Sequence, residues 1–169
     1  MRKLIVVLLL LTTSLFSVAK NKHKKKPPAG PQIMSVSVYH TACYGRCPTY
    51  KIEVNKDGLA TFTGIRFTPD SGVFTKNLGN ATAKEIIEPF LIARIDTFPD
   101  RYQSRVQDLP GIVLTITFSD SVKTISNANF GPPLLGRLRI KLDSILGPKR
   151  NEAGIILLDE SWHKQAGDH

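Results

Sequence analysis

The chain's only two cysteines, Cys43 and Cys47, lie in a short segment that concentrates chemically active side chains. This segment, from His40 to Tyr50, has the sequence HTACYGRCPTY. Two cysteines this close together can form a disulfide, exchange disulfides with other thiols, or bind a soft metal ion. Each of these uses implies a different class of protein.

A structural disulfide is the simplest use if the protein is exported, because an even number of cysteines in an exported chain generally forms bridges. Three intervening residues leave the chain room to curve, and Gly45 can adopt backbone angles that other residues avoid. The closed loop is small, so the chain-entropy model gives only about 2 kcal/mol of stabilisation. The possible recognition loop that such a bridge would hold consists of Tyr44, Gly45, Arg46, Pro48 and Tyr50.

A thiol–disulfide enzyme or a thiol sensor using the same cysteines is the alternative function. Thioredoxin-like enzymes place two residues between their cysteines and set the first cysteine at a helix N-terminus. Here three residues intervene, the segment leads into a predicted strand, and Pro48 follows the second cysteine. Arg46 could favour a thiolate, but one arginine alone does not define a redox site.

A metal site is the third reading, with His40, Cys43 and Cys47 as ligands that zinc or copper would accept. No fourth ligand is visible nearby, and oxidised cysteines do not bind metal. Elsewhere the sequence has no Gly-x-Ser-x-Gly, no His-Glu-x-x-His and no phosphate-binding glycine loop. We therefore expect no catalytic residues, no cofactor and no metal.

The first 19 residues predict a secretory signal peptide. Arg2 and Lys3 precede an apolar run that reaches Val18, and small residues before position 20 suit cleavage after Ala19. The apolar run is shorter than the ~20 residues that a membrane span needs. Lysines directly after the cleavage site oppose export, so an uncleaved membrane anchor is the alternative. We expect a periplasmic or extracellular protein.

Residues 20–32 are rich in lysine and proline and predict a basic, disordered leader. The net charge of the chain is +9, but seven positive charges lie within residues 1–26, upstream of the first acid, Glu53. A charge of only +2 remains for the rest, which argues against a nucleic-acid-binding surface. Membrane contact is expected only through the leader, and the domain is expected to be a monomer.

Residues 33–150 predict one α+β domain. Strands are indicated by alternating apolar and polar residues around 33–39, 50–55, 59–64, 72–76, 112–118 and 122–126. Asp57-Gly58 suits a tight hairpin, and a capping box starting at Thr82 predicts the first helix, with Pro89 as an awkward interior residue. A second helix is predicted from 132–133 to Gly147. The expected architecture is an antiparallel sheet of about six strands in the order ββββ-α-ββ-α, with two helices on one face. The tail, 151–169, is expected to be partly packed, including Trp162.

The segment Thr41 to Tyr50 resembles a family of bacterial extracytoplasmic domains of unknown function, marked by Thr-x-Cys-x-Gly-x-Cys-Pro-x-Tyr. The downstream order of an Asp-Gly hairpin, a helix, an Asp-x-Pro segment at 108–110, a hairpin and a final helix is also similar. The resemblance covers residues 33–147 and implies an extracytoplasmic location and a fold. It implies no activity, and His40 is not part of the pattern. We interpret the protein as a non-catalytic binding or envelope-associated module that recognises an unknown protein or envelope ligand.

Overall fold

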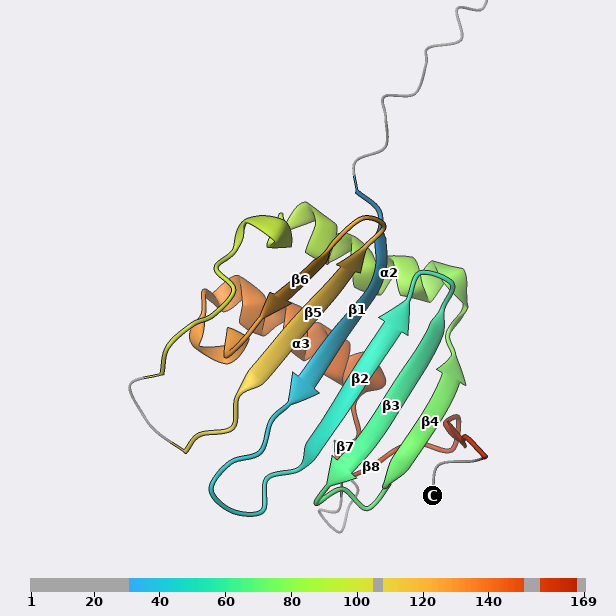
Figure 1. Ribbon diagram of the computed structural model, residues 1–169. Helices are drawn as coiled ribbons and strands as arrows, with labels where there is room; N and C mark the ends of the chain where they lie inside the picture. Colours follow the sequence, from blue (N-terminus) through green and yellow to red (C-terminus); the bar gives the residue numbers. More distant parts are fainter. Residues whose placement is uncertain (1–30, 105–107, 151–155, 167–169) are drawn as a thin grey trace, which may run out of the picture. The chain divides into compact units, whose positions relative to one another are not determined.

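The computed structural model of the protein describes residues 31–104, 108–150 and 156–166 (Figure 1). The predicted signal peptide, all but the last two residues of the predicted leader, and both ends of the predicted tail lie outside the described residues. The strands are β1 (Ile33–His40), β2 (Thr49–Asn55), β3 (Leu59–Arg66), β4 (Gly72–Asn77), β5 (Ile112–Phe118), β6 (Val122–Ile125), β7 (Lys149–Arg150), β8 (Ile156–Leu157) and β9 (His163–Lys164). The helices are α2 (Gly79–Ile92) and α3 (Pro133–Leu146), with 3-10 turns at Ile95–Thr97 and Ala128–Phe130.

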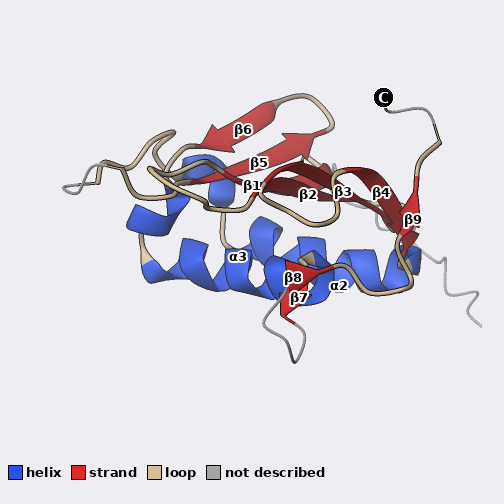
Figure 2. Ribbon diagram, turned by 90° about the horizontal axis from the view of Figure 1, so that it is seen from below, coloured by secondary structure: helices blue, strands red, loops and turns tan. Residues whose placement is uncertain are grey.

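The main sheet has seven strands in the order β6-β5-β1-β2-β3-β4-β9, and every neighbouring pair is antiparallel. Both helices cover one face of this sheet (Figure 2). The predicted α+β class is therefore confirmed, and a short strand from the tail adds a seventh strand to the predicted six. Strand β1 lies inside the sheet, because β2 pairs with one of its edges and β5 with the other.

The core lies between the sheet and the helices. Val38 on β1 pairs with Ile52 on β2 and with Leu114 on β5, and all three side chains are fully buried. Because strand side chains alternate between faces, the residues between these positions form the uncovered face, which is mostly hydroxyl-bearing or charged. This period of two is the signal that predicted the strands. The helices contribute a matching buried set that includes Ile86, Phe90, Leu135, Leu138, Leu142 and Leu146.

Helix α2 begins at Gly79, about one turn before the capping box that predicted its start at Thr82. Gly79 has a φ of +74°, which favours glycine, and its amide donates to Asn77 Oδ1 at 2.9 Å. The side chain that accepts at this helix start is therefore Asn77, and Thr82 lies inside the helix. Among the described residues, no helix is both long enough and apolar enough to cross a membrane.

Pro89 lies inside α2, at the start of its last turn. A proline has no N–H, so the carbonyl of Glu85, four residues earlier, loses its usual helical donor. Lys141 Nζ on α3 donates to that Glu85 carbonyl at 2.9 Å. A side chain from the neighbouring helix thus replaces the hydrogen bond that the proline removes.

The tail returns to the sheet near Trp162, which is 8% exposed and packs edge-on against Phe62, with ring centroids 6.2 Å apart. Directly after it, β9 pairs with β4 through the register Phe74 with Lys164. The tail therefore covers the part of the β4 edge at Phe74 and Thr75.

Candidate functional site

The cysteine segment lies at the end of the sheet where β1 ends and β5 begins (Figure 1). His40, the last residue of β1, pairs with Ile112, the first residue of β5. This register brings Thr41 beside Gly111: the Thr41 amide donates to the Gly111 carbonyl at 3.0 Å, and the Gly111 amide donates to Thr41 Oγ1 at 2.7 Å. The two hydrogen bonds fix the start of the loop to the central strands.

A disulfide joins Cys43 and Cys47, whose Cα atoms are 5.8 Å apart, a separation typical of bridged pairs. Gly45, in the middle of the bridged turn, has a φ of +137°, a region that side chains rarely adopt. Tyr44 is 90% exposed, and its amide donates to the Asp108 carbonyl at 3.4 Å. The bridge and the backbone contacts together present an aromatic side chain to solvent from a braced loop.

Phe67, the residue directly after β3, has two arginines over its ring. The Arg46 guanidinium carbon is 5.7 Å from the centroid of the Phe67 ring, and that of Arg66 is 4.7 Å away, both within cation–π range. The ring remains 39% exposed. The φ of Phe67 is +55°, which costs a bulky side chain about 1 kcal/mol or more.

A small pocket opens beside this stack, with a volume of about 190 Å³. Its walls are mainly apolar and come from the loop between β1 and β2 (residues 41–48, hereafter the bridged loop), the β3–β4 turn and the segment after α3. The apolar lining residues are Pro48, Phe62, Phe67, Pro69 and Pro148. Asp70 also lines the pocket, and one of its carboxylate oxygens accepts the Leu158 amide at 2.7 Å.

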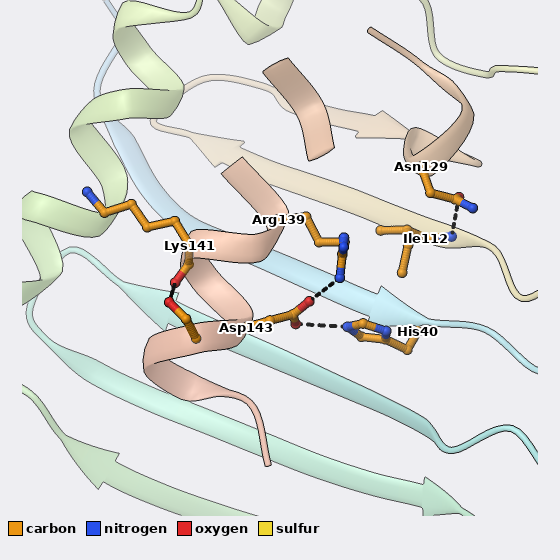
Figure 3. Close-up of polar contacts among 7 residues, drawn as sticks. His40, Ile112, Asn129, Arg139, Lys141 and Asp143 are labelled. Atoms are coloured by element: carbon orange, nitrogen blue, oxygen red, sulfur yellow. Dashed lines mark hydrogen bonds and ion pairs between the residues drawn. The ribbon is translucent and has the colours of Figure 1, made fainter. Parts of the chain in front are cut away.

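On the helix-covered face, His40 is part of a polar cluster with α3 (Figure 3). His40 Nε2 lies 2.9 Å from Asp143 Oδ1, and the Arg139 guanidinium donates to Asp143 Oδ2 at 2.6 Å. The His40 and Asp143 side chains are only 16% and 18% exposed. This cluster ties α3 to the strand from which the bridged loop emerges.

Tyr50 packs beneath this cluster, with its ring stacked 4.2 Å from the His40 ring and 5.5 Å from the Phe62 ring. Burial raises the pKa of the Tyr50 phenol well above its usual range, and the negative charge of Asp143 raises this pKa further. Tyr50 is therefore a neutral packing residue.

The three residues considered as metal ligands have other partners. The sulfurs of Cys43 and Cys47 are bonded to each other, and His40 Nε2 contacts Asp143. Within the part of the chain that the structure describes, no three His, Cys, Asp or Glu side chains are grouped so that they could hold a metal ion.

The structure separates the residues of the predicted recognition loop into two groups. Tyr44, Gly45 and Arg46 are exposed on the loop, whereas Pro48 lines the pocket and Tyr50 faces the helices. Sequence reasoning missed the two other parts of the site. The first part is Phe67 with Arg66, directly before the Thr68-Pro69-Asp70 turn, where an aromatic residue beside a turn was the only hint of a binding site. The second part is Arg139 with Asp143 on α3, and nothing in the local sequence marks these two residues as part of a site.

A comparison with protein families matches residues 34–146 to DUF6438, a domain of unknown function. The matched region runs from β1 to the end of α3 and includes the whole bridged loop. A comparison with curated proteins finds no match.

Proposed function

The chain belongs to the DUF6438 family, whose domain has no known function, and from this premise we propose that it is an exported, non-catalytic binding domain. Its binding surface is the bridged loop together with Phe67 and the adjoining pocket. Its ligand is a protein or another component of the cell envelope. Thiol–disulfide exchange by Cys43 and Cys47 is the alternative function.

The observation that supports this proposal is the 90% exposure of Tyr44 on a loop that is held at several points. Tyrosine and arginine are the residues that most often dominate binding energies at protein interfaces. A loop already fixed by a disulfide and by the Thr41–Gly111 hydrogen bonds loses little entropy when a partner binds. These properties suit recognition.

Export is supported by two independent features. A disulfide is stable in oxidising compartments and rare in the cytosol. The apolar run that follows Arg2 and Lys3 has the pattern of a signal peptide.

The experiment is capture from an envelope fraction by the immobilised protein, compared with the variant Tyr44→Ser. We expect the wild-type protein to retain a defined component and the variant to lose it. The matched control is Val122→Ser, which changes a side chain that is 64% exposed on β6, at the opposite end of the sheet. Equal retention by wild type and Tyr44→Ser would refute this surface as the binding site.

A further inference from the structure

The size of the pocket beside the bridged loop limits what can enter it. Small-molecule sites usually have volumes of about 300–1,000 Å³, and this pocket has about 190 Å³. The space therefore suits one side chain of a partner better than a whole metabolite or cofactor. Because its walls are mainly proline and phenylalanine, that side chain is apolar.

Two arginines lie beside the pocket, against its Phe67 wall. Arg46 and Arg66 both lie over the Phe67 ring, and neither guanidinium forms an ion pair with any carboxylate among the described residues. Arg94 and Arg139, in contrast, are paired with Asp96 and Asp143. Two cations held against one aromatic ring, without a carboxylate of their own, favour a negatively charged partner.

The negative charge nearest the pocket is Asp70. One of its oxygens accepts the Leu158 amide, so this carboxylate has a structural partner in the tail. Asp108 reaches the bridged loop through its backbone carbonyl, which accepts the Tyr44 amide. Asp70 therefore contributes one negative charge at the pocket wall, against the two positive charges of Arg46 and Arg66 beside Phe67.

The backbone of Phe67 adds a third observation. A positive φ at a phenylalanine persists only where the surrounding structure holds it. The Phe67 side chain both lines the pocket and contacts the two guanidiniums, so the ring serves as a pocket wall and as a cation platform.

We infer that the partner is an acidic peptide segment that inserts one apolar side chain into the pocket while its carboxylates contact Arg46 and Arg66. This inference rests on the proposed function and specifies the class of partner. Tyr44 then packs along the segment at the exposed tip of the bridged loop.

The test uses the purified protein as the cell produces it and short fluorescent peptides that carry a phenylalanine flanked by glutamates. We expect binding by fluorescence anisotropy, with affinity falling as the salt concentration rises. Replacing the peptide phenylalanine by serine should lower the affinity about tenfold or more, because the burial of one apolar side chain is lost. A peptide with lysines in place of glutamates should not bind.

Protein variants test the two components of the site separately. Phe67→Asn removes the ring but tolerates the positive φ, and it should reduce the preference for the apolar anchor. Arg46→Gln and Arg66→Gln should weaken binding and reduce its salt dependence. Arg137→Gln, an exposed arginine on α3, makes the same charge change and should have no effect.

Three results would overturn the inference. The first is equal affinity for peptides with and without the anchor. The second is binding to anionic phospholipid vesicles with the same dependence on Arg46 and Arg66, which would identify a lipid surface instead. The third is failure of all peptides to bind while Tyr44→Ser still abolishes envelope capture; the proposed function would then stand with another partner. Survival of envelope capture in Tyr44→Ser would instead contradict the proposed function itself.

Discussion

His40 on β1 and Asp143 on α3 are 103 residues apart in the sequence, yet His40 Nε2 lies 2.9 Å from Asp143 Oδ1. The other oxygen of the same carboxylate accepts the Arg139 guanidinium. One aspartate therefore joins the end of β1 to helix α3. The bridged loop starts one residue beyond this contact.

Asp143→Ala should lower the free energy of unfolding by about 1–3 kcal/mol, because it leaves His40 and Arg139 without their shared acceptor. Urea denaturation followed by circular dichroism measures the change. Asp96→Ala, which removes the partner of Arg94 in an exposed ion pair, is the control and should leave the midpoint unchanged. Equal midpoints for wild type and Asp143→Ala would show that the cluster contributes nothing to stability.

Lys141→Met should destabilise the protein by up to about 1 kcal/mol, because the Glu85 carbonyl loses its donor. In a Pro89→Ala background the same substitution should have almost no effect, since the amide at position 89 can then donate to that carbonyl. A double-mutant cycle in urea measures this coupling. Strictly additive effects of the two substitutions would contradict the conclusion that Lys141 replaces the hydrogen bond that Pro89 removes.

Alkaline pH should reveal the burial of Tyr50. Its pKa is raised in the folded protein, so the unfolded chain loses the phenolic proton first, at about pH 10. The contribution to stability is therefore fully present below about pH 10 and is lost as the pH rises toward the higher folded value. Urea denaturation at several alkaline pH values should show a steeper decline for wild type than for Tyr50→Phe. Tyr44→Phe, which removes an exposed phenol, should follow wild type.

The disulfide separates the two candidate functions. Replacing Cys43 and Cys47 together by alanine should cost about 2 kcal/mol and leave the circular dichroism spectrum intact, because the closed loop is small. Titration against dithiothreitol should give a reduction potential below about −300 mV, as is usual for structural bridges. Both cysteines are partly exposed, so a reductant can reach them. A potential near those of periplasmic oxidants, with a thiol reactive at neutral pH, would favour the redox alternative.

Processing of the N-terminus tests the predicted export. Cleavage after Ala19 should release a protein that begins at Lys20, and intact-mass measurement of the exported form checks this. A mass that includes Met1 and the apolar run would indicate a membrane anchor.

The strands were predictable because their signal is local. Val36 and Val38 alternate with polar neighbours, and Asp57-Gly58 marks a turn in which Gly58 has a φ of +90°. Each pattern depends on residues that are adjacent or two positions apart. Such a pattern predicts a strand or a turn without knowledge of which distant segments pack against it.

The rest of the site could not be predicted because it depends on contacts between distant segments. Helix α2 begins before the Thr82 capping box because the chain turns at the end of β4, where Asn77 Oδ1 accepts the Gly79 amide. The role of Asp143 has no local signal, because its partner His40 is 103 residues away on β1. Likewise, no pattern in the tail indicated that His163 would pair with β4.

The position of β1 between β2 and β5 also affects how the protein can fold. Its second neighbour, β5, ends at residue 118, so a chain synthesised from the N-terminus carries β1 with one open edge until that point has emerged. An open edge strand can pair with other chains. Completion of the sheet depends on a pairing between residues far apart in the chain, and such pairings slow folding. The β1 edge is thus closed only after β5 has been made, and until then the partly built sheet has an edge that can pair with other chains.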